Sequence, residues 1–266
     1  YVQNGPKRSV IEAFRGVGKS WITSAYVCHQ LLLNPDKNIL VVSGSKQRAD
    51  DFSTFTLRLI SDMPVLKHLK PSDSQRNSKI AFDVALAGAS HAPSVVSKGI
   101  FSQITGSRAD LIIADDVESL NNSATQTMRD KISEAIKEFD AVLKPNGEIV
   151  VLGTPQTEAS LYSVLPERGF NVRIWPAKFP KKTQRTGYGD ALAPYISSKI
   201  EEDEELVGKP TDPKRFDETD LMEREASYGR TGFNLQFMLD TSLADADRYP
   251  LKLSDLIVMS LNPLQG

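Results

Sequence analysis

The sequence predicts an α/β fold in which a mainly parallel sheet is flanked by helices, followed by a small helical subdomain. Apolar runs alternate with amphipathic stretches over the first two thirds of the chain, and the composition shifts after about Pro176. Strands that are apolar along their whole length are typical of parallel sheets covered on both faces. Right-handed crossovers bring the carboxyl ends of such strands to one edge, where ligands bind.

The spacing of apolar residues places the individual elements. Short apolar runs predict strands at residues 9–14, 38–43, 79–86, 94–100, 111–114, 148–152 and 172–175. Apolar residues three or four positions apart predict helices at residues 18–33, 46–62, 124–143 and 218–238. We expect polar loops at 181–189 and 209–213, with a charged stretch at 199–205 between them.

Three regions follow from this order. Residues 1–176 are expected to form the core, 177–240 a helical subdomain, and 241–266 a linker. The linker ends in an apolar segment, 253–261, which we interpret as the first strand of a further unit. The chain opens on Tyr1 rather than Met, so we expect a processed or truncated chain.

Composition narrows the classes of protein. The 266 residues are 40% hydrophobic and 25% charged, which excludes disorder and fibrous repeats. The 32 basic and 34 acidic residues nearly cancel, which excludes a protein that coats nucleic acid through bulk positive charge. The single cysteine, Cys28, excludes an internal disulfide and a cysteine-based metal site. No apolar run approaches the roughly 18 residues of a membrane span, so we expect no membrane association.

Residues 13–20 match the Walker A phosphate loop except at the first position, where Ala13 stands in place of glycine. A strand precedes the loop and a helix follows it, as the motif requires; an accidental glycine-rich turn is the alternative. Backbone N–H groups of the loop would point at phosphate oxygens, and the lysine would bridge the β- and γ-phosphates. The serine hydroxyl would ligate Mg²⁺. The residues predicted to bind the nucleotide are Arg15, Gly16, Val17, Gly18, Lys19 and Ser20.

Arg15 is an unusual residue within this loop. It lies within reach of the γ-phosphate, where a guanidinium could neutralise charge in the transition state as an arginine finger supplied in cis. The alternative is an arginine that faces solvent or DNA. We favour the catalytic role because of its position in the loop.

Residues 111–118 have the pattern of a Walker B strand, a buried run that ends in acids. Asp115 would hold Mg²⁺ at the ligand edge of the sheet. A second carboxylate must orient and deprotonate the attacking water, and Asp116 and Glu118 both qualify. We slightly favour Glu118, which has the longer reach and, in an extended chain, faces the same side as Asp116. An acidic turn at the strand end is the alternative for the whole segment.

Residues 150–156 form another buried strand with small and polar residues at its end. P-loop ATPases of the additional-strand class insert one strand between the Walker A and Walker B strands. Thr154 and Gln156 would then lie between the γ-phosphate and the acids, where a hydroxyl or amide can sense the phosphate. Taken alone, the segment is better explained as a plain turn broken by Pro155.

Together these segments resemble the large terminase subunit of tailed bacteriophages, most closely the podophage branch, where it is also called DNA maturase B. The resemblance rests on the phosphate loop at 14–20, the Thr-Gly-Ser-Arg-Ala-Asp run at 105–110 leading into 114–118, and the segment at 152–158. Residues 210–216 and 232–239 look like the end of that family's ATPase region. The likeness spans most of residues 5–250.

The resemblance implies a P-loop motor ATPase of the additional-strand class that uses ATP and Mg²⁺ to pump double-stranded DNA into a procapsid. It implies a coupling motif at Gly153, Thr154 and Pro155, with Thr154 counted among the catalytic residues, and a helical lid at about 177–240. A second arginine of the family reaches into the neighbouring subunit's site, and Arg108 is our candidate. A salt bridge beside Asp110 explains Arg108 equally well.

The same resemblance implies a setting. The partners would be double-stranded DNA, the portal protein, the small terminase subunit and further copies in a ring of five. The protein would work in the host cytoplasm, docked on the viral procapsid. The family's adenine-reading glutamine would precede Tyr1, and its RNase H-like nuclease would follow residue 250. Asp245 and Asp247 do not form the acid cluster of such a nuclease, so we expect no nuclease activity here.

Two other functions remain as alternatives. A helicase or recombinase core would usually carry glycine in place of Ala13 and further nucleic-acid motifs. A nucleotide-gated binding module without turnover fits poorly with the paired acids and Arg15. Basic residues that could touch DNA phosphates, or simply face solvent, are Lys67, Lys70, Arg76, Lys79, Lys181, Lys182 and Arg185.

Overall fold

A central sheet organises the chain in a computed structural model, which describes residues 1–157 and 160–241. Seven strands lie in the order β3-β4-β2-β5-β6-β1-β7. All neighbouring pairs are parallel except β3 with β4. The predicted α/β class is confirmed. The strands are β1 (Arg8–Ala13), β2 (Ile39–Ser43), β3 (Ala81–Phe82), β4 (Val95–Gly99), β5 (Ala109–Asp115), β6 (Leu143–Gly153) and β7 (Asn171–Trp175).

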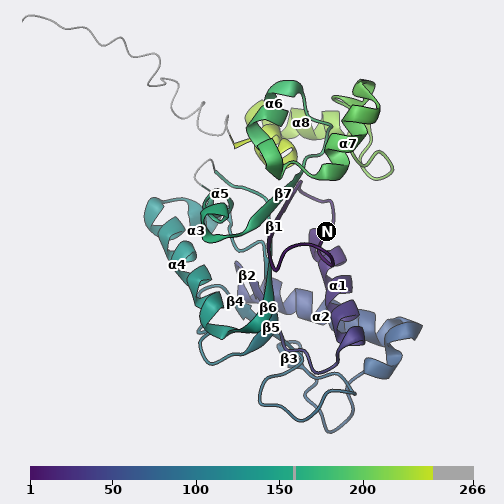
Figure 1. Cartoon of the computed structure of the whole chain (residues 1–266), viewed down its shortest axis with the longest axis vertical. Helices are drawn as coiled ribbons and strands as arrows, with labels where there is room; N and C mark the ends of the chain where they lie inside the picture. Colours follow the sequence, from purple (N-terminus) through teal and green to yellow (C-terminus); the bar gives the residue numbers. More distant parts are fainter. Residues whose placement is uncertain (158–159, 242–266) are drawn as a thin grey trace, which may run out of the picture.

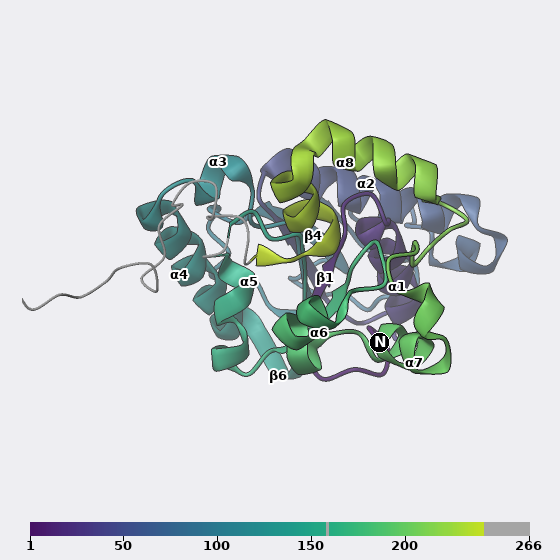
Figure 2. The same cartoon turned by 90° about the horizontal axis from the view of Figure 1, so that it is seen from above.

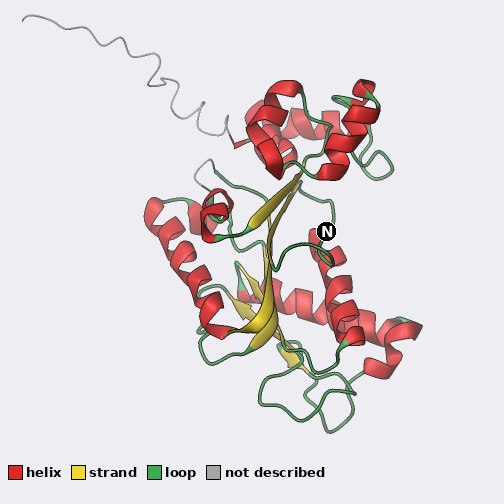
Figure 3. Ribbon diagram, viewed as in Figure 1, coloured by secondary structure: helices red, strands yellow, loops and turns green. Residues whose placement is uncertain are grey.

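Helices cover both faces of the sheet (Figures 1 and 3). One face carries α1 (Lys19–Leu33), α2 (Lys46–Asp62) and η1 (Pro64–Leu69). The other carries α3 (Leu120–Ser123), α4 (Gln126–Val142) and α5 (Leu161–Val164). Alternate residues of each strand feed two separate cores: Val41 packs toward α1 and α2, whereas Val42 packs toward α4. This two-faced burial explains why the strands are apolar throughout.

The remaining helices gather at one end of the molecule, near β1 and β7 (Figures 1 and 2). They are α6 (Lys182–Tyr188), η3 (Gly189–Ala191), α7 (Pro194–Glu202), η4 (Glu204–Leu206), α8 (Glu218–Phe233) and η5 (Asn234–Met238). The short helix η2 (Pro166–Arg168) stays beside α5, and its Arg168 bonds to Ser133 of α4. A small apolar cluster joins the helices at this end to the core, with Phe14 against Phe216, Phe233 and Phe237. The division into a core at 1–176 and a lid at 177–240 stays a prediction. The proposed linker lies outside the described residues from 242 onward.

Strand β6 lies between β1 and β5. Its residues Val150 and Val151 pair with Ser9 and Val10 on one side, and with Ile113 and Ala114 on the other. The strand predicted to lie between the Walker A and Walker B strands is therefore present. β1, β6 and β5 end at Ala13, Gly153 and Asp115, so all three motifs reach the same edge of the sheet.

Several predicted elements were wrong in extent or type. The strand expected at 79–86 shrinks to two residues because Ser78 closes a turn onto Ala81 and the Ser94 hydroxyl accepts the Val84 N–H. The helix expected at 124–143 is present as α4, which begins after its Thr125 cap, and the short helix α3 that precedes it was not predicted. Residues 182–188 form a helix rather than a loop.

The last predicted helix divides at Gly229, where φ is 68°, and ends in the π-helix η5. Cys28 is buried, in line with its interpretation as a packing residue. Within the described ranges, no helix has the length and apolar character needed to cross a membrane.

Candidate nucleotide-binding site

The phosphate loop follows β1 and leads into α1. Gly16 and Gly18 both have φ 89°, a left-handed conformation that costs glycine little. A Cβ on Gly18 would lie 2.9 Å from Nη1 of Arg215, and a Cβ on Gly16 would lie 3.2 Å from the Phe216 ring. The Arg215 guanidinium also donates to the Val17 carbonyl oxygen at 2.8 Å. The left-handed conformation therefore favours glycine at both positions, and a side chain at either would also displace Arg215 or Phe216.

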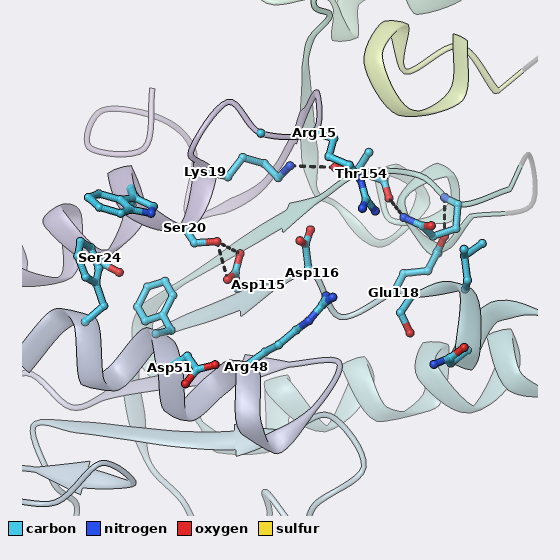
Figure 4. Close-up of a pocket in the computed structure, with 18 residues that line it drawn as sticks. Arg15, Lys19, Ser20, Ser24, Arg48, Asp51, Asp115, Asp116, Glu118 and Thr154 are labelled. Atoms are coloured by element: carbon cyan, nitrogen blue, oxygen red, sulfur yellow. Dashed lines mark hydrogen bonds between the residues drawn. The ribbon is translucent and has the colours of Figure 1, made fainter. Parts of the chain in front are cut away.

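Lys19 lies deep in the site. Its Nζ donates to the Ala13 carbonyl oxygen at 2.9 Å and to Thr154 Oγ1 at 2.8 Å. Burial lowers the pKa of Lys19, while the nearby Asp116 and Asp115 carboxylates raise it. The ammonium thus connects the phosphate loop to the end of β6, as Figure 4 shows.

Ser20 and Asp115 form a pair across the site. The Ser20 hydroxyl lies 3.0 Å from Oδ1 and 2.8 Å from Oδ2 of Asp115, to which it donates. Burial raises the pKa of Asp115 to about 6, and the neighbouring Asp116 carboxylate adds to that rise. A hydroxyl beside a desolvated carboxylate is a donor set that suits Mg²⁺.

Asp116 and Glu118 differ in where they point. Asp116 has φ 45°, and its carboxylate extends into the cavity (Figure 4). Glu118 is 2% exposed, and its Oε1 accepts the Gln156 N–H at 3.0 Å. Its Oε2 accepts from the Ser160 hydroxyl at 2.9 Å and the Leu161 N–H at 2.7 Å. Burial raises the pKa of Glu118 and these hydrogen bonds oppose that rise.

The end of β6 lies between the phosphate loop and the acids. Thr154 Oγ1 donates to the Ala13 carbonyl oxygen at 3.1 Å, and Gln156 Nε2 donates to the Thr154 carbonyl oxygen at 2.9 Å. Thr154 is therefore next to Lys19, and Gln156 is next to Glu118. The segment predicted to lie between these groups does so.

Arg15 is bonded to the C-terminal helices. Its side-chain Nε donates to Oε1 of Gln236 at 3.0 Å, and its backbone N–H donates to the Gln236 carbonyl oxygen at 3.1 Å. Gln236 Nε2 in turn donates to the Pro155 carbonyl oxygen at 3.1 Å. Gln236 thus links the phosphate loop to Pro155, just beyond the end of β6. Sequence reasoning assigned it no role because its position in a π-helix leaves no periodic signal.

Arg108 lies apart from the site. It precedes β5, whereas Asp115 ends that strand, so the two residues lie at opposite edges of the sheet. Its guanidinium donates to the Ser107 carbonyl oxygen at 2.9 Å. Asp110 forms an ion pair with Lys144 at 2.8 Å, so the salt bridge considered for Arg108 is made by another residue.

These groups surround a cavity of about 630 Å³. Arg15, Gly16, Lys19, Ser20, Asp115, Asp116, Glu118, Thr154 and Gln156 all line it, so the structure brings most of the predicted residues together. Residues that sequence reasoning missed also line the cavity, among them Arg48 and Asp51 from α2 and the tilted ring pair of Trp21 from α1 and Phe55 from α2. Their positions depend on the packing of α2 against α1 and against β2 and β4, which no local pattern encodes.

Comparisons with known proteins identify the family of this chain. Residues 10–184 match the family model "Terminase large subunit, T4likevirus-type, N-terminal". The terminase large subunit of Enterobacteria phage T3 is 50% identical over 261 residues, which cover 96% of this chain and 44% of that protein. The chain thus spans less than half the length of this curated relative.

Solved structures show the same fold. The large terminase ATPase domain of Thermus phage P74-26 has a TM-score of 0.50 and 14% identity, with 89% of each chain covered. A mutant of that domain gives a TM-score of 0.50 and 13% identity over the same shares. The resemblance drawn from the motifs is confirmed: the chain belongs to the terminase large subunit family.

Proposed function

We propose that this chain binds and hydrolyses ATP·Mg²⁺ as the motor part of a machine that drives double-stranded DNA into a viral procapsid. The observation that carries the proposal is the meeting of Lys19, the Ser20–Asp115 pair and Asp116 at one sheet edge. Membership in the terminase large subunit family supports the same function. Because the chain spans part of its relative, the activity of the whole protein is included in the proposal.

The phosphate loop would hold the triphosphate. Loop N–H groups and the amino end of α1 favour phosphate oxygens, and the Lys19 ammonium would exchange Thr154 for the β- and γ-phosphates. Ser20 and Asp115 would hold Mg²⁺, which when bound neutralises charge on the phosphates. No cluster of three His, Cys, Asp or Glu side chains with metal-binding geometry occurs among the residues described. Phosphate oxygens and water would therefore complete the metal's ligands.

An apolar cavity of about 300 Å³ adjoins the other side of the loop. Val17, Ile22 and Tyr195 line it together with the N-terminal Tyr1. We propose that it receives the adenine ring, because it lies next to Lys19 and its walls come from both the core and the C-terminal helices.

Asp116 is our choice of general base. Its carboxylate points into the cavity, and no hydrogen bond to it from another described side chain is present. Both oxygens of Glu118 already accept hydrogen bonds from Gln156, Ser160 and Leu161. That carboxylate is therefore better suited to hold residues 156–161 in place. Arg15 would act in cis once it leaves Gln236.

The proposed setting comes from the family. Double-stranded DNA, the portal protein, the small terminase subunit and a homo-oligomeric ring of five would be the partners, in the host cytoplasm at the procapsid. Arg108, exposed and far from its own site, is free to serve a neighbouring subunit's site as a trans arginine. The near-neutral net charge of −2 favours DNA contact through a few local cations over a uniformly basic surface.

Lys19→Ala tests the proposal. Nucleotide binding is measured on this chain, and ATP hydrolysis and packaging into procapsids on the full-length protein. Because the ammonium contacts the transferred phosphate, we expect ATP hydrolysis to fall by several hundred-fold or more, on the order of the 10²–10⁴-fold loss seen for key charged groups. Lys131→Ala, which replaces an exposed lysine on α4, is the matched control. A Lys19→Ala protein that packages DNA would refute the proposal, and strand unwinding by the wild type without packaging would favour the helicase alternative.

A further inference from the structure

Arg48 is a charged residue of the cavity that no motif includes. It lies in the first turn of α2, where the Ser45 side chain accepts the Arg48 N–H at 3.3 Å. Ala49 and Phe52 are buried under the helix and fix its rotation. The side chain consequently crosses the cavity toward Asp116, opposite the phosphate loop (Figure 4).

The Arg48 guanidinium has no acceptor in the part of the chain that the structure describes. Lys46, two residues earlier on α2, forms an ion pair with Asp50. The two other cations that line the cavity also have hydrogen-bond acceptors. Lys19 is bonded to Thr154, and Arg15 is bonded to Gln236. Arg48 is thus the cation of the site whose donors are all available to a ligand.

The charge of the site explains what that ligand should be. Asp115 and Asp116 already place negative charge in the cavity, and the Arg48 charge acts on Asp115 to oppose the rise of its pKa. Mg²⁺, Lys19 and Arg15 together only balance the charge of a triphosphate, so the negative charge of Asp115 and Asp116 is left without a counter-charge from these groups. A guanidinium matches two phosphoryl oxygens at once, and its charge is permanent.

We propose that Arg48 binds the γ-phosphoryl oxygens from the side opposite the phosphate loop and so distinguishes ATP from ADP. This inference rests on the proposed ATP site. The terminal phosphate would lie between Lys19 on one side and Arg48 on the other. Charge that spreads onto its oxygens in the transition state would be stabilised from both sides.

The test compares affinities for two nucleotides in the presence of Mg²⁺. Calorimetry measures binding of AMP-PNP, a non-hydrolysable ATP analogue, and of ADP to the chain. A charge-assisted contact made only to the γ-phosphate predicts that Arg48→Ala weakens AMP-PNP binding roughly ten- to a hundred-fold and leaves ADP binding within about two-fold. Arg48→Lys should recover part of the lost AMP-PNP affinity, because an ammonium keeps the positive charge but cannot donate two parallel hydrogen bonds as a guanidinium does.

Arg58→Ala is the matched control, since Arg58 is an exposed arginine on the same helix outside the cavity. It should alter neither affinity. Equal losses for both nucleotides in Arg48→Ala, an unchanged AMP-PNP affinity, or a lower free energy of unfolding than Arg58→Ala would each overturn the role of Arg48. Failure of the ATP site itself would differ, because Lys19→Ala would then bind AMP-PNP as tightly as the wild type.

Discussion

The two walls of the nucleotide cavity differ in how their charged groups are bonded. On the phosphate-loop wall, Lys19 and Arg15 each have protein acceptors, which come from β6 and from η5. On the opposite wall, Arg48 and Asp116 extend into the cavity without such partners among the described residues. One wall must therefore exchange bonds when phosphate enters, whereas the other is ready for a ligand.

This difference separates two tasks. The bonds of the phosphate-loop wall lead outward, from Arg15 through Gln236 to Pro155, so their exchange can move the coupling segment. The free groups of the opposite wall have no such connection and are better suited to phosphate and water. The comparison predicts that variants on the free wall alter nucleotide binding or hydrolysis without changing the free energy of unfolding, whereas variants on the bonded wall also lower that free energy.

Asp116→Asn should give the largest effect on the free wall. Removing the proposed general base is expected to lower the rate of ATP hydrolysis roughly 10²–10⁴-fold, because proton transfer from the attacking water loses its acceptor. AMP-PNP affinity and the free energy of unfolding should stay close to wild type. Phosphate release and calorimetry measure these quantities, with the exposed Asp73→Asn as control.

Glu118→Gln provides the matching test on the bonded side. Its amide would face backbone and hydroxyl donors, which leaves a buried donor without an acceptor and lowers the free energy of unfolding by about 1–3 kcal/mol. Hydrolysis should fall less than in Asp116→Asn. The assignment of the base would reverse if Glu118→Gln abolished hydrolysis at unchanged stability while Asp116→Asn retained it.

The orientation of Glu118 differs from the one that the sequence predicted. Alternation along an extended strand places residues 116 and 118 on one side. The positive φ of Asp116 breaks that alternation, so Glu118 turns to the coupling segment instead. A left-handed residue at a strand end is decided by its surroundings, among them the Gly44 N–H that donates to the Asp116 carbonyl oxygen at 3.3 Å.

Other parts of the site were predictable because their residues are contiguous. Strand and ligands are contiguous in both segments, at residues 8–20 for the phosphate loop and 109–118 for the Walker B segment, and burial of the strands fixes their place. Arg48 and Gln236 reach the site only because β2 pairs with β5 and because Gly229 and η5 redirect the last helix. Those are long-range contacts, which no short pattern encodes.

Gly153→Ala tests the packing of the bonded wall. A Cβ at Gly153 would overlap the ring of Tyr162, which is 1% exposed. Because a fully buried ring has little room to shift, we expect a loss of about 1–3 kcal/mol in the free energy of unfolding. Chemical denaturation measures it. Gly187→Ala, whose Cβ would meet nothing within 4 Å, is the control and should be neutral or slightly stabilising. A Gly153→Ala protein as stable as that control would contradict the packing described here.

Glu12 lies on β1 before the phosphate loop and lines a neighbouring cavity, and its predicted effect on stability depends on pH. It is 7% exposed on β1, and no hydrogen bond to its carboxylate is found within the described residues. Burial, with a smaller contribution from Glu118, raises its pKa from 4.5 to about 7. With a raised pKa, the Glu12 carboxyl binds a proton more tightly in the folded state than in the unfolded chain. The free energy of unfolding therefore falls as pH rises from about 4.5 to 7, and the loss is complete above that range. Glu12→Gln removes the titration, so its gain in free energy of unfolding should grow between about pH 5 and pH 8, to at most about 3 kcal/mol. Denaturation of both proteins at several pH values measures this difference, and Glu138→Gln on the exposed side of α4 is the control. If the stability difference between Glu12→Gln and the wild type did not change with pH, the raised pKa of Glu12 would be contradicted.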